Sequence, residues 1–132
     1  MKDIEYLNEY KKYPLVNFDI SRKTITKNNS ELKTYYMEFL REFKNSKDKI
    51  DEKIRFFEFY NIMKEAHKIK GSCSYFGCKQ LQEICSSMIL ECNVSINLLD
   101  DNDKKECMNE IKNLYFLLCV NYIELEKKCE EL

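Results

Sequence analysis

The stretch FYNIMKEAHKIKGSCSYFG, residues 59–77, contains the pattern that decides the fold of this chain. Its apolar residues recur every three or four positions, which is the repeat of one face of an α-helix. They are Phe59, Ile62, Ala66, Ile69, Cys73 and Phe76. This repeat predicts a long amphipathic helix with one continuous buried stripe. Gly77 follows the last apolar residue and predicts a turn there.

The same helical repeat continues toward the N-terminus from Glu31. Ser30 or Asn29 is the predicted N-cap of this helix, because both side chains can accept a hydrogen bond from a free helix N–H. Its predicted core positions are Leu32, Tyr36, Phe39, Phe43, Ile50, Ile54 and Phe57. A bend at residues 56–58 is predicted to separate it from the helix at 59–76.

The repeat also continues toward the C-terminus in two further segments. The first carries Cys78, Leu81, Cys85, Met88 and Cys92, and a loop is predicted over 93–103 because Asn and Asp favour turns. The second begins at about Asp103 and carries Met108, Ile111, Tyr115, Leu118, Tyr122, Leu125 and Cys129. Four amphipathic helices of similar length predict an all-α protein, an antiparallel four-helix bundle.

The N-terminal extension, residues 1–30, is less regular than the core bundle at about 31–131. Tyr6, Leu7 and Tyr10 predict a short helix within residues 1–13, which Pro14 ends. Residues 15–30 show no clear helical repeat. We therefore expect a single domain over 1–132, with one or two additional short N-terminal helices.

Composition excludes several classes of protein. Two glycines and one proline in 132 residues are too few for a β-sandwich or a glycine-rich nucleotide-binding fold. A formal net charge of −1 argues against a nucleic-acid partner, which needs a basic surplus. No stretch predicts a signal peptide or a membrane span, since the longest late uncharged run, 113–123, is too short. We expect a cytoplasmic monomer, with nuclear entry open to it in a eukaryotic cell.

The seven cysteines are predicted to be reduced and mostly buried. Their odd number and the absence of a leader favour a reducing compartment. Cys78, Cys85 and Cys92 recur every seven residues, but three ligands so spaced on one helix cannot converge on a zinc ion unaided. Core packing explains them better, because a thiol behaves as a small apolar group. Cys73 lies on a different helix face from His67, which argues against a Cys–His nucleophile pair.

A second stripe on the helix at 59–76 faces away from the core. His67, Lys70, Gly71 and Ser74 stand at relative positions 0, 3, 4 and 7 and share one face. Imidazole has a pKa of about 6.5 and is a nucleophile near pH 7. A lysine one turn away could bind phosphoryl oxygens, and a glycine beside the ring would leave room for a partner. The plainer interpretation is a solvated histidine and lysine, with Gly71 at a helix end.

The literal string EAHKIKGSCSYFGCKQLQEIC, residues 65–85, resembles the signature of histidine-containing phosphotransfer (HPt) domains. The resemblance rests on an Ala-His pair, an apolar residue, a Lys-Gly pair, small residues, an apolar-Gly pair and a helix with Leu and Cys. In this chain they are Ala66-His67, Ile69, Lys70-Gly71, Ser72, Cys73, Phe76-Gly77, Leu81 and Cys85. A weaker likeness at Phe39, Leu40 and Phe43 extends it over roughly residues 15–130.

The resemblance implies a four-helix bundle with an exposed phosphorylated histidine. His67 would accept and donate the phosphoryl group, Lys70 would be its charge partner, Gly71 would give clearance, and Gly77 would allow the tight turn. Residues expected to support or dock a partner are Lys68, Ser74, Tyr75 and Gln82. The chain departs from the family at Ile89, where a polar residue often helps to orient the site.

The function implied is that of a phosphorelay intermediate. It would take a phosphoryl group from the phospho-aspartate of a receiver domain, including the receiver of a hybrid histidine kinase, and pass it to another receiver aspartate. The chain itself would bind no cofactor and have no turnover alone, because Mg²⁺ is expected on the receiver. The alternative is a module that docks receiver or histidine-kinase domains without transferring phosphate. A purely structural bundle would leave the second stripe unexplained.

Overall fold

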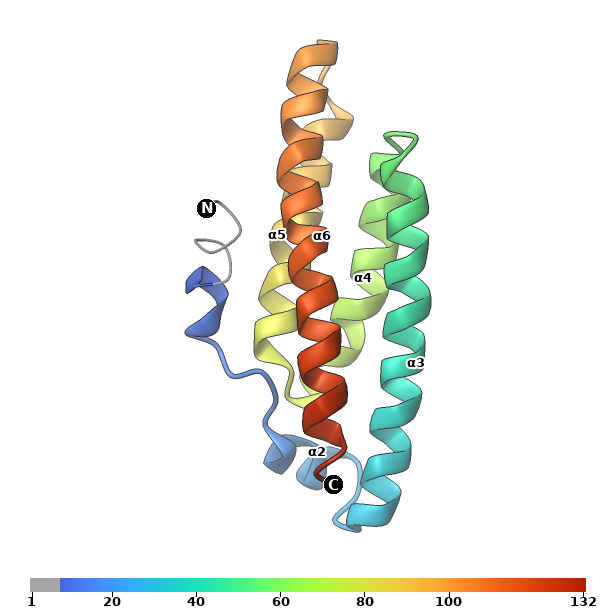
Figure 1. Ribbon diagram of the computed structural model, residues 1–132, viewed down its shortest axis with the longest axis vertical. Coiled ribbons are helices and arrows are strands. Elements are labelled where there is room, and N and C mark those ends of the chain that lie inside the picture. The colour runs from blue at the N-terminus through green and yellow to red at the C-terminus, as the bar shows by residue number, and fades with distance from the viewer. Residues whose placement is uncertain (1–7) are drawn as a thin grey trace.

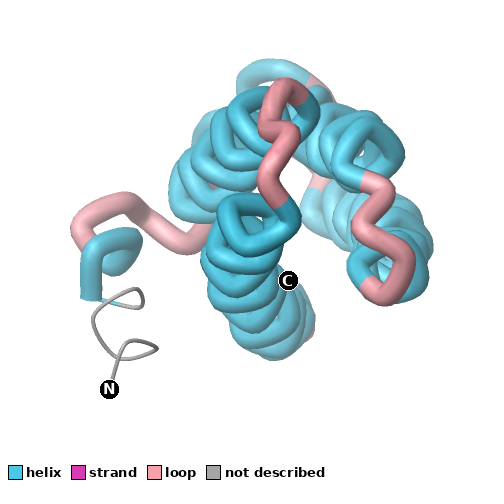
Figure 2. The backbone as a smooth tube through the Cα atoms, turned by 90° about the horizontal axis from the view of Figure 1, so that it is seen from above, coloured by secondary structure: helices cyan, strands magenta, loops and turns pink. Residues whose placement is uncertain are grey.

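The computed structural model describes residues 8–132, and all regular structure in this part of the chain is helical. After a short helical turn at residues 8–11 come α2 (Phe18–Thr24), α3 (Asn29–Ile54), α4 (Phe59–Phe76), α5 (Lys79–Ile96) and α6 (Asp101–Cys129). The four long helices run alternately up and down (Figure 1). Each packs against its neighbours in sequence, and α6 packs back on α3 (Figure 2). The predicted all-α antiparallel four-helix bundle is confirmed.

The predicted apolar stripes form the core, with four exceptions. Tyr115 and Tyr122 of α6 are only partly buried, although both pack against the core. The other two exceptions lie at helix ends. Phe57 is 42% exposed because α3 ends at Ile54 and the chain turns through residues 55–58, with Phe57 itself at a φ of 54°. Phe76 is only partly buried, since it is the last residue of α4. Its ring still packs on the core, stacked on Phe39 with ring centroids 4.6 Å apart.

Two helix boundaries differ from those predicted. The N-cap of α3 is Asn28, whose side chain accepts from the N–H of Glu31, rather than Asn29 or Ser30. The predicted loop at 93–103 shrinks to residues 97–100, because α5 continues to Ile96 and Asp100 caps α6. Ser95 helps to extend α5, since it is fully buried and its hydroxyl donates to the Glu91 carbonyl at 2.7 Å.

Residues 8–27 form a segment that we call the N-terminal arm, which lies along the outside of the bundle (Figure 1). Tyr10 is buried, and its hydroxyl donates to Ser87 of α5 at 2.6 Å. Tyr6 and Leu7 fall outside the described residues. The expected short N-terminal helices are present, but the sequence did not place α2, whose seven residues make only two turns and bury Ser21 in place of an apolar side chain.

The cysteines pack as predicted. All seven are free, five are buried, and Cys107 and Cys119 are partly exposed. Burial raises the pKa of the Cys73 and Cys92 thiols to about 12. Burial likewise raises the pKa of Cys78 and Cys85 well above the ordinary value. These thiols are therefore protonated near pH 7 and act as apolar core groups.

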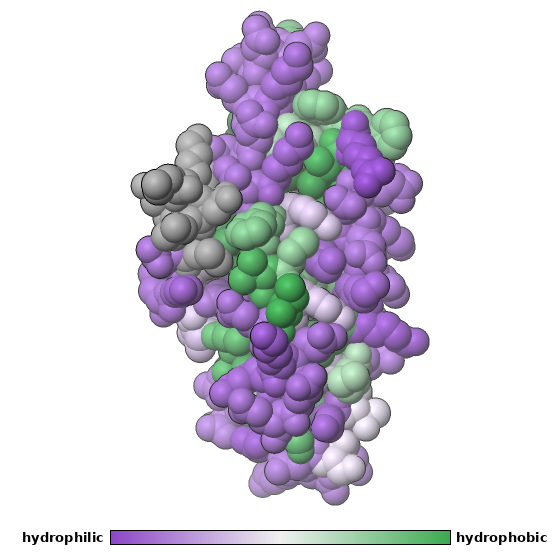
Figure 3. Space-filling view, viewed as in Figure 1, coloured by the Kyte–Doolittle hydropathy of each residue, from purple (hydrophilic) through white to green (hydrophobic). Residues whose placement is uncertain are grey.

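The outer surface is polar over most of the face that Figure 3 shows, and apolar side chains gather at its middle, over α6. Exposed apolar residues of this helix include Phe116 and Ile123. In the part of the chain that the structure describes, none of the helices has the length and apolar character needed to cross a lipid bilayer.

Candidate functional site

His67 lies midway along α4 and is exposed, as predicted. The opposite face of the same helix is anchored in the core, where Ala66 and Cys73 are 0% and Ile69 is 3% exposed. Within residues 8–132 no hydrogen bond or ion pair engages the imidazole ring. The histidine therefore stands exposed on a helix whose opposite face is fixed by burial.

Gly71 leaves open space beside the histidine. A Cβ built at this position would have nothing within 4 Å. Gly71 is not a helix end, because α4 continues to Phe76 and is capped by Gly77 at a φ of 67°. Since a glycine inside a helix costs about 0.5–1 kcal/mol relative to alanine, the empty space is maintained at some cost to stability.

Lys70 is half-buried at the edge of the same face. Although burial raises the pKa of Cys73 overall, the positive charge of Lys70 opposes that rise. The lysine charge therefore acts on the buried thiol as well as on the exposed face of the helix. One helical turn separates Lys70 from His67, which is the spacing at which side chains on a helix surface can act on the same group.

The exposed face of α4 is basic. Lys64, His67 and Lys68 are exposed, whereas the single acidic residue of the helix, Glu65, is 8% exposed. Glu65 is also neutralised by Lys68, whose ammonium lies 3.2 Å from its carboxylate. Because no carboxylate of α4 faces outward, this surface complements an acidic partner.

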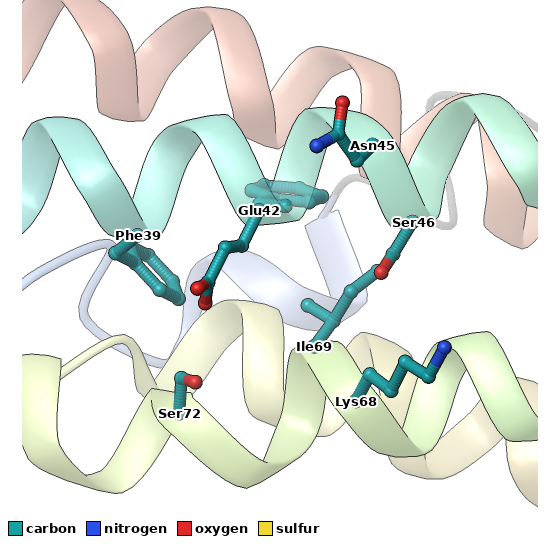
Figure 4. A pocket seen from close by; sticks show the side chains of 8 residues that line it. Phe39, Glu42, Asn45, Ser46, Lys68, Ile69 and Ser72 are labelled. Atoms are coloured by element: carbon teal, nitrogen blue, oxygen red, sulfur yellow. The ribbon is translucent and has the colours of Figure 1, made fainter.

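Lys68 lies on the side of α4 that borders α3, and its ammonium pairs with Glu65. Together with Ile69 and Ser72 it lines a groove of about 280 Å³ between α3 and α4. Figure 4 shows Glu42 reaching from α3 toward α4 in this groove, while Lys68 lies along α4. The groove lies on the flank of the histidine helix. The structure therefore separates Lys68 from the stripe formed by His67, Lys70, Gly71 and Ser74.

Ser74 and Gln82 lie near the C-terminal end of α4. Both line a shallow pocket of about 260 Å³, to which α4, α5 and the N-terminal arm contribute. Gln82 is half-buried and makes no side-chain hydrogen bond to His67 in the described part of the chain. Ile89 is 8% exposed and belongs to the core. α5 therefore presents an apolar, inward-facing side chain where the family often has a polar one.

Aromatic residues flank the histidine on its helix. Tyr75, predicted from the sequence, is 58% exposed, and Tyr60, which the sequence analysis did not single out, is 59% exposed. Tyr60 stands seven residues before His67 and so shares its face, and Lys64 lies over its ring, 5.6 Å from the centroid. The helical spacing of Tyr60 was a signal that could have identified it.

No pattern in the sequence identified the arm residues of the shallow pocket. Asn17 and Ile20 lie beside Ser74 there. They belong to the segment 15–30, in which no helical repeat is visible, so nothing in the order of residues places them near α4.

The match to a family of known proteins agrees with this geometry. The family model of the Hpt domain matches residues 35–115, more than half of the chain, and this range includes all of α4 and α5. No match was found among curated proteins or among solved structures. The chain therefore belongs to the Hpt domain family, the modules of histidine phosphotransfer in two-component phosphorelays.

Proposed function

We propose that this protein is a phosphorelay intermediate that carries a phosphoryl group on His67. The observation that supports this most strongly is an exposed histidine without a hydrogen-bond or ion-pair partner among residues 8–132, on a helix fixed by its buried face, with empty space at Gly71. A histidine used for structure would be hydrogen-bonded within the fold. A phosphoryl acceptor must instead be free to enter another protein's site.

The chemical step is a transfer between the phospho-aspartate of a receiver domain and the imidazole. The lone pair of one ring nitrogen of His67 attacks phosphorus and forms the N–P bond. The P–O bond to the aspartate breaks, and its electron pair stays on the aspartate carboxylate. The other ring nitrogen keeps its proton. Transfer onward to a second receiver aspartate is the reverse of this step.

Each side of the complex supplies different groups. The receiver brings the aspartate, its acidic pocket and Mg²⁺, which neutralises the phosphoryl oxygens. This chain brings the nucleophile, the Lys70 ammonium for those oxygens, and the basic face of α4 for docking. Ser74, Tyr75, Gln82 and, on the flank, Lys68 are the proposed docking and support residues. The protein works as a monomer in a reducing compartment, the cytoplasm, and has no turnover without its partners.

The test is transfer from a receiver domain that has been phosphorylated with acetyl phosphate and Mg²⁺. The native chain should acquire a label that is labile in acid and stable in base, while the receiver loses its own. His67→Gln should keep the melting temperature and acquire no label. Because the chain has a single histidine, a phosphohistidine label has only one place to be.

The alternative, a docking module without transfer, has some support from Ile89, which supplies no polar group to the site. It predicts that a phosphorylated receiver binds the chain with measurable affinity but transfers no label. A receiver that neither binds nor transfers, in a panel that includes receivers of hybrid kinases, would contradict both functions.

A further inference from the structure

The C-terminal end of α4 is held from outside the helix by the N-terminal arm. The last carbonyls of a helix have no partner within it. The hydroxyls of Ser21 and Thr24 lie 3.0 and 3.2 Å from the Tyr75 carbonyl. The backbone N–H of Asn17 donates to the Gly77 carbonyl at 2.9 Å. Two successive turns of the arm therefore cap the end of the helix that carries His67.

The hydroxyl hydrogens of this cap can be assigned by counting donors. The Tyr36 hydroxyl donates to the Phe76 carbonyl at 2.6 Å, which uses its only hydrogen. The Ser21 hydroxyl lies 2.5 Å from the Tyr36 oxygen and must then be the donor in that pair. The Thr24 hydroxyl lies 2.9 Å from the Ile20 carbonyl of its own helix and 3.2 Å from the Tyr75 carbonyl, so its one hydrogen is shared between these two acceptors. With this assignment the Phe76 carbonyl has Tyr36 as its donor, and the Tyr75 carbonyl has the Thr24 hydroxyl.

The arm also fits closely against the turn after α4. A Cβ added to Gly77 would lie 2.3 Å from the carbonyl oxygen of Asn17. Only glycine allows this approach, and the left-handed backbone at Gly77 favours glycine as well. The close contact means that the arm and the α4–α5 turn cannot shift independently.

A second anchor joins the arm to α5 and α6. The backbone N–H of Gln80 donates to the Pro14 carbonyl at 3.0 Å, and its side-chain Nε2 donates to the Tyr13 carbonyl at 3.3 Å. Because Nε2 faces Tyr13, the Gln80 Oε1 is the acceptor for Asn121 Nδ2, 2.7 Å away. The Tyr13 carbonyl therefore fixes the orientation of the Gln80 side-chain amide, which in turn fixes that of the Asn121 side-chain amide.

The arm also forms part of the surface near His67. Asn17 and Ile20 line the shallow pocket together with Ser74 and Gln82. Ser74 stands seven residues after His67, which places it about 10 Å along the same helix face. A receiver domain centred on His67 is wide enough to cover this pocket. The arm itself makes no hydrogen bond to the histidine in the described residues.

We propose that the N-terminal arm is a positioning element of the docking surface, with Ser21 and Thr24 as the positioning residues that fix the end of α4. This inference rests on the proposed function and extends it to a segment outside the family match at 35–115. The arm sets the affinity for the receiver and leaves the reactivity of the imidazole unchanged. Removal of the Ser21 and Thr24 hydroxyls should therefore weaken receiver binding without changing the rate at which His67 reacts.

The experiment compares the double variant Ser21→Ala/Thr24→Val with a matched control, Ser95→Ala/Thr34→Val. Ser95 is as fully buried as Ser21, and it also donates to a backbone carbonyl. Thr34 is exposed on α3 and donates to the Ser30 carbonyl. Thr24 is likewise exposed and donates to the Ile20 and Tyr75 carbonyls. Both variants remove two hydroxyls of similar burial, but only the first pair lies at the end of α4.

Two phosphoryl donors separate the two effects. The first is a phosphorylated receiver that labels the native chain, titrated to saturation, and the second is phosphoramidate, a small donor that needs no docking surface. The cap variant should raise the half-saturating receiver concentration about three- to tenfold, the factor that corresponds to a neutral hydrogen bond or two. Its saturating rate and its rate with phosphoramidate should equal those of the native chain. The control should lose similar thermal stability with no change in half-saturation.

Two results would overturn the proposal. One is a cap variant with native half-saturation despite the loss of stability, which would make the arm merely structural. The other is a fall in the phosphoramidate rate, which would mean that the arm acts on His67 itself. A native chain that accepts phosphoryl from neither donor would instead refute the proposed function, so the two failures can be told apart.

Discussion

The surroundings of His67 are marked by open space at Gly71 rather than by hydrogen bonds or ion pairs in the described part of the chain. The imidazole and Gly71 share an exposed helix face, and apart from the adjacent backbone of α4 nothing in the described chain lies within 4 Å of where a Gly71 side chain would begin. This arrangement suits a group that must enter a cleft on another protein. It also separates two properties that most substitutions change together, helix stability and access to the histidine.

Replacing Gly71 with glutamine should move these two properties in opposite directions. Stability should rise by about 0.5–1 kcal/mol because glutamine has the better helix propensity, while transfer should slow because its side chain fills the space that a partner enters. The measurements are the urea unfolding curve and the rate of transfer from a phosphorylated receiver. Gly71→Ala, the control, should gain similar stability and keep most of the transfer. Native transfer rates in Gly71→Gln would disprove the clearance role.

Lys70 should affect the rate of transfer more than docking. The Lys70→Ala variant loses a charge-assisted contact to phosphoryl oxygens, so its saturating transfer rate should fall by roughly tenfold or more. Its half-saturating receiver concentration should change little, and Lys70→Arg should recover part of the rate. The control is Lys112→Ala, which removes an exposed lysine of α6. If Lys70 served only in docking, Lys70→Ala would keep the native saturating transfer rate and need a higher receiver concentration for half-saturation.

At the scale of elements, the turn between α4 and α5 fixes the geometry of the site. Gly77 ends α4 in the left-handed region and lies against the N-terminal arm, while the neighbouring carbonyls accept hydrogen bonds from the arm. The end of the histidine helix is thus tied to α5 and to the arm at one point.

Gly77→Ala should therefore be strongly destabilising. The left-handed backbone costs a non-glycine residue about 1–2 kcal/mol, and displacement of the Asn17 carbonyl adds to that, so a loss of at least about 2 kcal/mol is expected in urea unfolding. Gly71→Ala makes the same chemical change on the same helix and should have the opposite sign. Equal effects at the two glycines would contradict the structural roles assigned to them.

The sequence predicted the long helices and the histidine face because both follow a 3.6-residue repeat sustained over several turns. Ile69 and Cys73 could be assigned to the core, and His67 to the surface, from spacing alone. The repeat fails at helix ends, where tertiary contacts decide. Phe57 leaves the core because the chain turns there, and α2 is invisible because Ser21, a polar residue, is its buried one.

At the scale of the whole molecule, the buried thiols link stability to pH. Burial raises the pKa of Cys73 and Cys92 to about 12 and that of Cys129 to about 11, from an ordinary value of 9.0. Between pH 9 and the raised pKa values, the thiols of the unfolded chain release protons that the folded chain retains. The contribution of these thiols to the free energy of unfolding is therefore complete below pH 9 and is lost as the pH rises toward 11–12.

The free energy of unfolding should fall with pH above 9, by up to about 1.4 kcal/mol per pH unit for each such thiol. In Cys73→Ala the free energy of unfolding should fall less steeply with pH than in the native chain, because unfolding releases up to one proton fewer. This difference in slope does not depend on the stability of the variant at pH 7. Urea unfolding at a series of pH values from 8 to 10.5 measures both slopes. The same pH dependence of the free energy of unfolding in both proteins would mean that Cys73 has the same pKa in the folded and unfolded states.

The central claim is that the phosphoryl group resides on the ring of His67. The most direct measurement is nuclear magnetic resonance of the ¹⁵N-labelled chain after phosphorylation by a receiver domain, with detection of the ¹⁵N and ³¹P nuclei. We expect scalar coupling between phosphorus and one imidazole nitrogen of His67, with little change in the signals of the buried core. That coupling should be lost when an unphosphorylated receiver is added. A phosphoryl group coupled to no ring nitrogen, or a chain that binds the phosphorylated receiver and remains unphosphorylated, would contradict it.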